Sequence, residues 1–249
     1  MLLADMTWNE VKNYISEVND NLIIPVGTCE QHGYHLPLGN DTFVAEYMAN
    51  ILSEKTKALV APAINYGVNL PCDVHLAGTT SIKPETLREI IVSITCWWRQ
   101  QGFKHFLLLT YHGDPFHLHA MEKISDNIRL YDLSEIEYSD ILEKQSFIRH
   151  ACEGETSVAL FLYPDKVKME SVQEHDIPFD DFRKYLYHED SNLPEGYVGS
   201  LGYPSFAEKD KGSRILSRMI DRMLSECRDF LKPSWHRQVC NTAADDDSV

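Results

Sequence analysis

The sequence predicts an α/β fold in which a largely parallel sheet carries helices on both faces. Three short apolar runs lack polar alternation, which is typical of strands buried on both faces: residues 22–26, 58–62 and 106–109. Each run leads, after a loop, into a stretch with helical spacing, and this repeating order favours parallel strands. The chain has 249 residues, enough for one large domain with a well-buried core. We expect that domain over residues 1–233 and a flexible acidic tail over residues 234–249.

The helices are predicted from apolar spacing and from the residues at their ends. They span residues 41–53, 84–101, 116–129, 155–162 and 209–230. Asp41 suits a helix start, and Pro84 suits a first turn because its missing N–H would be unpaired there anyway. Gly102 suits a helix end. The stretch 165–208 is weakly periodic and is expected to cover this domain.

Charge and cysteine usage exclude several classes of protein. The net charge is −15, from 38 acidic and 23 basic residues, and such a field repels nucleic-acid backbones and anionic membranes. The six cysteines lie far apart without CxxC spacing, which indicates reduced thiols. The N-terminus lacks the basic and apolar regions of a secretory signal, and no apolar run approaches the ~20 residues of a membrane helix. We therefore expect a cytoplasmic protein with no nucleic-acid or membrane partner.

The loop after the first predicted strand has the most unusual composition. Residues 25–41 read PVGTCEQHGYHLPLGND and include Glu30, His32 and Asp41. Glu30 and His32 are two residues apart, so an extended loop would place them on one face. Carboxylate and imidazole groups suit Zn, Mn or Fe, one Asp can bridge two ions, and the loop's glycines would let it fold back. The spacing matches no general zinc pattern, so a turn-rich, solvated loop is the alternative.

Two later segments carry similar side chains. His112 and Asp114 follow the strand at 106–109, at the strand end where open α/β sheets bind ligands. Residues 150–157, HACEGETS, could add a further ligand and an acid/base group. Taken alone, His112 is better explained as a core or surface histidine, and the glutamates as ordinary helix N-terminal residues.

Together, the three segments resemble the creatininase (creatinine amidohydrolase) family. Residues 25–41 are similar to the pattern P-x-G-[S/A]-x-E-Q-H-G-x-H-L-P-x-x-x-D. Residues 150–157 resemble H-A-G-E-x-E-T-S, with Cys152 in place of glycine, and residues 110–115 resemble N-G-H-G-G-N or N-G-H-x-E-N. The resemblance extends to about residue 231 and implies a creatininase-like three-layer fold and a homo-oligomer, a hexamer.

The resemblance also implies a site for one or two divalent ions per subunit, with Zn expected first and Mn or Fe as alternatives. The implied ligands are carboxylates and imidazoles: Glu30, His32, Asp41, His112, Asp114 and Glu155. Asp41 would bridge the ions, and either Asp114 or Glu155 would complete the second site. His150 is implied as the proton shuttle, and His150 or Glu153 would protonate the leaving nitrogen.

The expected activity is metal-dependent hydrolysis of a non-peptide C–N bond in a small cyclic amide or formamide. Hydrolysis of a C–C bond in a cyclic ketone and a non-catalytic, metal-binding role are the alternatives. Thr110 and Pro115 replace the asparagines of the second motif, and Asp73 stands where many members have histidine. The residues that face the substrate therefore differ, and the sequence does not specify creatinine.

Overall fold

The central element is one parallel sheet, seen in a computed structural model that describes residues 1–174 and 193–237. Its strands, in the spatial order β2-β1-β3-β4, are β2 (Leu59–Val60), β1 (Asn21–Val26), β3 (His105–Thr110) and β4 (Ile128–Asp132). Every neighbouring pair is parallel. The predicted fold class is therefore confirmed.

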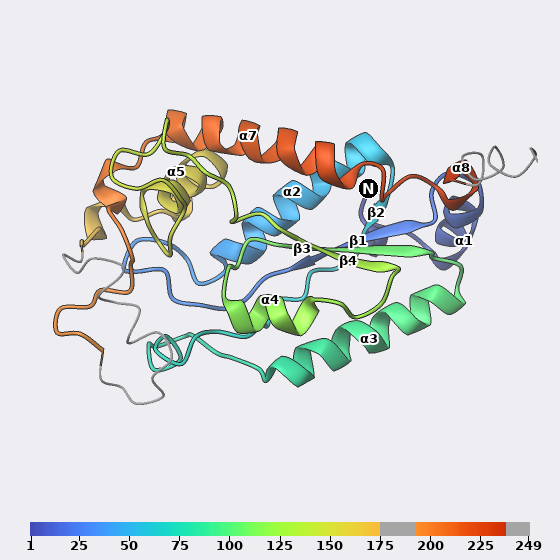
Figure 1. Cartoon of the computed structure of the whole chain (residues 1–249), viewed down its shortest axis with the longest axis horizontal. Coiled ribbons are helices and arrows are strands. Elements are labelled where there is room, and N and C mark those ends of the chain that lie inside the picture. Colours follow the sequence, from blue (N-terminus) through green and yellow to red (C-terminus); the bar gives the residue numbers. More distant parts are fainter. Residues whose placement is uncertain (175–192, 238–249) are drawn as a thin grey trace, which may run out of the picture.

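Helices cover both faces of this sheet and make three layers (Figure 1). One face carries α2 (Asn40–Thr56), α5 (Glu153–Leu162) and α7 (Lys209–Cys227). The other face carries α1 (Trp8–Glu17), α3 (Pro84–Gln100) and α4 (Pro115–Met121). The short helices are η1 (Leu3–Asp5), η2 (Pro164–Lys166), η3 (Met169–Ser171), η4 (Pro204–Phe206) and α8 (Ser234–Arg237).

The two cores explain why the strands are apolar without alternation. Ile23 and Leu107 pack into the core beneath α2 and α7, whereas Ile24 and Leu108 pack into the core beneath α1 and α3. Successive side chains point to opposite faces of a strand, so a sheet covered on both faces needs apolar residues at every position.

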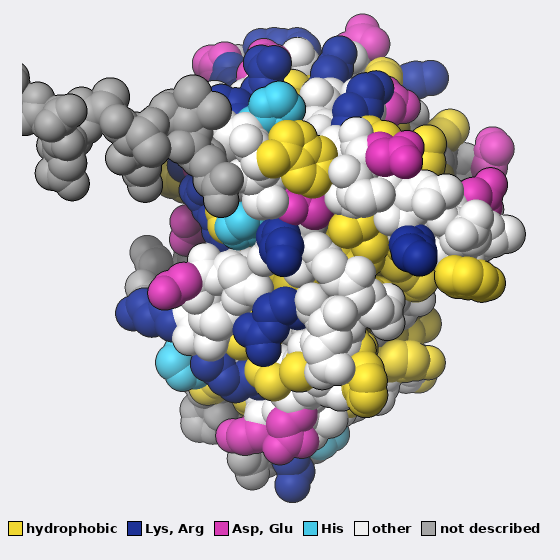
Figure 2. All heavy atoms as spheres, turned by 90° about the vertical axis from the view of Figure 1, so that its right-hand side faces the viewer, with side chains coloured by type: hydrophobic (Ala, Val, Ile, Leu, Met, Phe, Trp, Pro, Cys, Tyr) yellow, Lys and Arg dark blue, Asp and Glu magenta, His cyan; other side chains and the backbone are white. Residues whose placement is uncertain are grey.

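The carboxyl ends of the strands lie at one end of the molecule, together with α5 and most of the long loops (Figure 1). The loops after β1 and β3 thus reach the same place, as the sequence predicts. At the opposite end, the visible Lys and Arg side chains are mixed with Asp and Glu and with separate hydrophobic side chains (Figure 2).

The helix predicted over residues 116–129 is wrong in its second half. α4 ends at Met121, Lys123 has a positive φ of 49°, and residues 128–132 form the strand β4. Ile128 and Leu130 pack on the α3 side of the sheet and Tyr131 on the α7 side, which is a period of two. The consequence is a third loop, after β4, at the carboxyl edge.

Two other expectations need adjustment or lie partly outside the described residues. The tail was expected from residue 234, but residues 234–237 form α8, and the Ser234 N–H donates to Asp20 Oδ1 at 3.0 Å. The rest of the tail and part of the covering stretch, residues 238–249 and 175–192, lie outside the described residues. Five cysteines in the described part are free thiols. No helix in that part is both long and apolar enough to cross a bilayer.

We predict that Gly212→Ala destabilises the protein by about 2 kcal/mol. A Cβ at Gly212, in α7, would clash with the backbone oxygen of Ser157 in α5, so the two helices would have to separate. This cost exceeds the gain of about 1 kcal/mol that alanine brings to a helix interior. Urea unfolding measures the difference.

The matched control is Ser213→Ala, at the exposed neighbouring position of the same helix, which should change stability by less than about 0.5 kcal/mol. Equal stabilities of the two variants would contradict this account of the α5–α7 contact.

Candidate metal centre

The loop after β1 folds back on itself because two backbone segments approach closely. A Cβ on Gly27 would lie 2.6 Å from the Thr42 Cα, so only glycine lets the first turn of α2 pack against the end of β1. Further along, the Glu30 N–H donates to the Leu38 carbonyl at 3.0 Å and closes the loop. Asp41, in the first turn of α2, is thereby brought beside the residues around Glu30.

Asp41 lies at the centre of a buried cluster and faces a different imidazole with each oxygen. Its Oδ1 is 3.2 Å from His32 Nε2, and its Oδ2 is 3.3 Å from His112 Nδ1. His112 Nδ1 is also 3.1 Å from Glu30 Oε2, and His32 Nε2 is 3.7 Å from Glu155 Oε2. Two groups of three residues therefore share Asp41.

Backbone carbonyls fix the orientation of both imidazole rings. His32 Nδ1 lies 3.1 Å from the Glu30 carbonyl oxygen, and His112 Nε2 lies 2.9 Å from the Val68 carbonyl oxygen. A carbonyl only accepts, so each of these nitrogens carries the proton. The other nitrogen of each ring then faces Asp41, which is how histidine ligands of metals are usually oriented.

The cluster holds more negative charge than its own imidazoles balance. Burial lowers the pKa of His32, but the carboxylates of Asp41 and Glu155 outweigh it and raise the pKa to about 10. Burial raises the pKa of Asp41, but His32 and His112 outweigh it and hold that pKa well below its usual range. The pKa of Glu155 is raised, because burial is only partly offset by His32. A cation at this place would relieve the imbalance.

The donor atoms also fit metal ions. Each of the two groups sharing Asp41 has one ligand atom per residue, all within 4.8 Å of one another: Glu30, Asp41 and His112, and His32, Asp41 and Glu155. Glu30 Oε2 and Asp41 Oδ2 are buried, and both lie close to the same imidazole nitrogen, His112 Nδ1, at 3.1 and 3.3 Å. Carboxylate and imidazole donors are the usual set for Zn and Mn.

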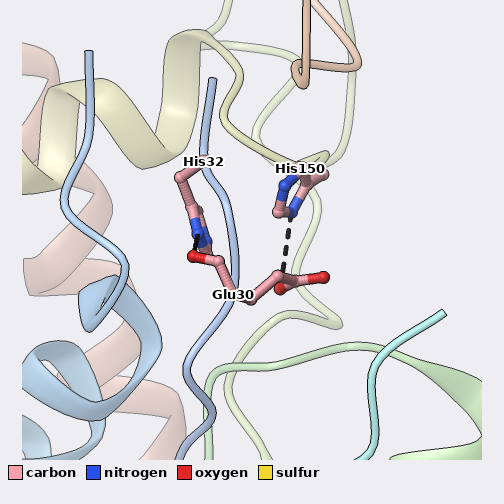
Figure 3. Close-up of side chains that lie close together, drawn as sticks. All are labelled: Glu30, His32 and His150. Carbon is pink, nitrogen blue, oxygen red and sulfur yellow. Dashed lines mark hydrogen bonds and ion pairs between the residues drawn. The ribbon is translucent and has the colours of Figure 1, made fainter. Parts of the chain in front are cut away.

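His150 stands at the edge of this cluster, in the loop that leads into α5. Its Nδ1 is 3.8 Å from Glu30 Oε2, and its ring centroid is 4.4 Å from that of His32 (Figure 3). The ring lines a cavity of about 700 Å³ together with Glu30, Asp41 and Glu155. The first and third sequence motifs thus meet at one cavity wall.

Asp114 lies apart from both groups that share Asp41. Its Oδ1 caps the N-terminus of α4 by accepting from the N–H groups of Phe116 at 2.6 Å and His117 at 3.3 Å. Burial raises the pKa of Asp114 to about 6. Asp114 lines the cavity, and its Oδ2 is buried without a hydrogen-bond partner among the described residues. Between the two expected alternatives, the geometry brings Glu155 and not Asp114 to His32.

Glu153 does not join the cluster either. Its side chain is fully buried, and its Oε1 accepts from Lys211 Nζ at 2.8 Å. The same carboxylate accepts from the Glu143 N–H, and Glu153 is not among the residues that line the cavity. The expected role of Glu153 in protonating a leaving group has no support in this geometry.

The structure adds residues that the sequence does not identify. Gln31 Nε2 lies 2.7 Å from Asp73 Oδ1 and 2.9 Å from His150 Nε2, and the Tyr197 hydroxyl donates to Asp73 Oδ1 at 3.3 Å. Asp132 at the end of β4 and Ser134 and Glu135 in the following loop also line the cavity, and the sequence does not identify them because the helix predicted over residues 116–129 runs into the start of β4. Aspartate in place of the family's usual histidine at position 73 is the only sequence signal for the hydrogen-bonded group of Gln31, Asp73 and Tyr197.

Comparisons with known proteins agree with this geometry. A family model described as Creatininase, creatinine amidohydrolase, matches residues 4–227. The chain is 31% identical over 212 residues to 3-dehydro-scyllo-inosose hydrolase from Thermotoga maritima. This alignment covers 79% of this chain but only 63% of the relative. The chain is 23% identical over 258 residues to creatinine amidohydrolase from Pseudomonas putida, and that alignment covers 94% of this chain and 98% of the relative.

Solved structures share the fold at low sequence identity. A manganese form of creatininase has a TM-score of 0.78 at 22% identity, covering 93% of this chain and 99% of that one. A Zn-Zn form of a creatininase variant has a TM-score of 0.78 at 21% identity, covering 93% and 98%. The three-layer architecture is therefore that of these proteins.

We predict that Lys211→Met destabilises the protein by about 3–5 kcal/mol, because it leaves the buried Glu153 carboxylate without its cation. Adding Glu153→Gln should restore part of the loss, since the amide carries no charge. Urea unfolding of the single and double variants measures both effects.

Lys209→Met is the control, at an exposed position of α7, the helix that also carries Lys211. It should lower the free energy of unfolding by less than about 0.5 kcal/mol. A small effect of Lys211→Met would show that the ion pair is not what holds Glu153 in place.

Proposed function

The chain belongs to the creatininase family of hydrolases, and we propose that it is a metal-dependent hydrolase of a C–N bond in a small molecule. The observation that carries this proposal is the buried cluster in which two groups of ligand residues share Asp41. A cyclic amide or a formamide is the proposed substrate class. The homo-oligomeric state and the cytoplasmic location stay predictions from the sequence.

In this proposal the two ions are held by residues from three segments of the chain. Glu30, Asp41 and His112 would hold one ion, and His32, Asp41 and Glu155 the other. Zn is proposed first and Mn second, because the solved neighbours include a Zn-Zn form and a manganese form. When bound, such an ion would lower the pKa of water to roughly 7 and so supply a nucleophile at neutral pH.

The chain's own residues would bind and orient the substrate at this centre. The cavity of about 700 Å³ is large enough for a small molecule, and Glu30, Asp41 and Glu155 lie in its wall. His150 faces the same space with Nδ1 towards Glu30 Oε2. It is therefore the side chain placed to interact with the reacting carbonyl or the leaving group. Leu70 and Leu201 add apolar side chains to the wall.

One observation favours a second candidate, hydrolysis of a C–C bond in a cyclic ketone. The relative with 31% identity is named 3-dehydro-scyllo-inosose hydrolase, whereas the identity to creatinine amidohydrolase is 23%. Both reactions begin with attack on a carbonyl carbon, so the same ligand residues would serve either one. A screen of cyclic amides, formamides and cyclic ketones distinguishes the two reactions.

We predict that the purified protein binds two Zn²⁺ ions per chain and that Glu155→Gln binds one. Glutamine lacks the negative charge of the carboxylate beside His32, so the second ion should be lost while Glu30, Asp41 and His112 still hold the first. Asp41→Asn should weaken both sites. Elemental analysis after dialysis measures the number of ions per chain.

Asp114→Asn is the matched control in the same cavity and should keep two ions, because Asp114 caps α4. Loss of one ion in Asp114→Asn, with two retained in Glu155→Gln, would assign the second site to Asp114. No stoichiometric binding in the wild type would contradict the metal-dependent function.

We predict that the Zn²⁺-loaded protein hydrolyses at least one member of a panel of cyclic amides, formamides and cyclic ketones. Asp41→Asn should lower the rate by at least about 100-fold, since loss of groups that merely orient metal ligands already costs 10–100-fold. Product release is followed by chromatography. If no compound distinguishes the wild type from folded Asp41→Asn, the chain is a non-catalytic, metal-binding member of the family.

A further inference from the structure

We propose that Gln31 and Asp73 fix the hydrogen bonding of His150 so that Nε2 is an acceptor and the ring proton is on Nδ1. His150 then presents an N–H group to the cavity as a hydrogen-bond donor and has no lone pair for a metal ion on that side. The catalytic consequence rests on the proposed function, but the geometric assignment does not. It specifies the ring nitrogen through which His150, the proton shuttle expected from the sequence, would donate.

The amide of Gln31 can adopt only one orientation. Its Oε1 accepts from the Gly33 N–H at 2.9 Å, and its Nε2 donates to Asp73 Oδ1 at 2.7 Å. A flipped amide would place NH₂ against an N–H group and a carbonyl oxygen against a carboxylate. The backbone of Gly199 packs so closely on Oε1 that a Cβ there would clash, which keeps this side chain in place.

Asp73 is the fixed acceptor that sets this orientation. Its side chain is buried, with 3% of the residue exposed. Gln31 Nε2 and the Tyr197 hydroxyl donate to Oδ1, and the Cys72 thiol donates to Oδ2 at 3.4 Å. Every hydrogen bond in this set is donated to the carboxylate, as an ionised, acceptor-only group requires.

The remaining N–H of Gln31 decides the form of His150. Gln31 Nε2 is 2.9 Å from His150 Nε2, and an amide NH₂ group has no lone pair with which to accept. His150 Nε2 must therefore be the acceptor, and the proton of the neutral ring is on Nδ1. Nδ1 faces Glu30 Oε2 at 3.8 Å, an acceptor that favours an N–H on that side.

This assignment separates His150 from the metal ligands. By distance alone, Glu30, His32 and His150 form a third group that could hold an ion. A protonated Nδ1 cannot coordinate a metal, whereas it can donate to a carbonyl oxygen that gains negative charge during attack. A neutral imidazole N–H is a known donor of this kind. Gln31 and Asp73 then act as positioning residues through His150.

The test is the position of the ring proton in the Zn²⁺-loaded protein with ¹⁵N-labelled histidine. Long-range ¹H–¹⁵N NMR distinguishes protonated from unprotonated ring nitrogens, and the His150 signals are identified by their loss in His150→Ala. We expect protonated Nδ1 in the wild type. Gln31→Glu should move the proton to Nε2, because a carboxylate can only accept. Gln100→Glu, the same substitution at an exposed position of α3, should leave the wild-type pattern.

A wild type with its proton on Nε2, or a folded Gln31→Glu variant with the wild-type pattern, would overturn the proposal. If Gln31→Glu does not fold, the ring proton of His150 is located in Asp73→Asn instead. Its amide can offer Gln31 either an oxygen or an NH₂ group, so only the Gly33 N–H still favours the wild-type orientation. A fraction of His150 should then carry its proton on Nε2, and a pure Nδ1–H form would contradict the role of Asp73. The metal-free protein can be measured in the same way, so failure to bind Zn²⁺ or to hydrolyse a substrate is a separate result.

Discussion

The burial of Asp41 between two imidazoles is the constraint on which the rest of the site depends. An unpaired carboxylate in a protein interior costs several kcal/mol, and here Glu30 and Glu155 lie beside Asp41 in the same buried cluster. The fold meets part of this cost with the N-termini of α2 and α5, whose partial positive charge favours the carboxylates in their first turns. His32 and His112 offset a further part of this cost, and the neighbouring carboxylates raise the pKa values of both imidazoles.

The parts of the site that could be predicted from the sequence are those in which the decisive contacts are local. Glu30, His32 and Asp41 lie within one loop and the first turn of the next helix, so their spacing carries the information. His112 could be placed because it follows a strand whose carboxyl end lies at the same sheet edge. The fold class was predictable for the same reason, since β1, β2 and β3 are each recognisable from their own composition.

The predictions that failed or stayed open concern residues whose roles depend on contacts between distant segments. Asp114 and Glu155 are both acidic, and the sequence cannot show that one caps α4 while the other reaches His32. Glu153 is engaged by Lys211, 58 residues away, and no spacing rule predicts that pair. The short strand β4 was lost because its alternation is brief and follows directly on a helical pattern.

The same distinction separates the proposed metal ligands from the residues proposed to position His150. Gln31 lies within the predictable loop, yet its role comes from Asp73 and His150, 42 and 119 residues away. Position 73 is one of the places where this chain departs from the pattern it resembles. Differences in substrate within a shared metal centre are expected to arise from such surrounding residues, because the ligands themselves serve any carbonyl.

The most direct test of the central claim is a crystal structure of the Zn²⁺-loaded protein with anomalous scattering at the zinc edge. The account predicts two peaks on either side of the Asp41 carboxylate, one within ligand distance of Glu30 and His112 and the other within ligand distance of His32 and Glu155. Asp114 should remain the cap of α4, and His150 should coordinate neither ion. A single peak, or a second ion bound by Asp114 or His150 in place of Glu155, would contradict it.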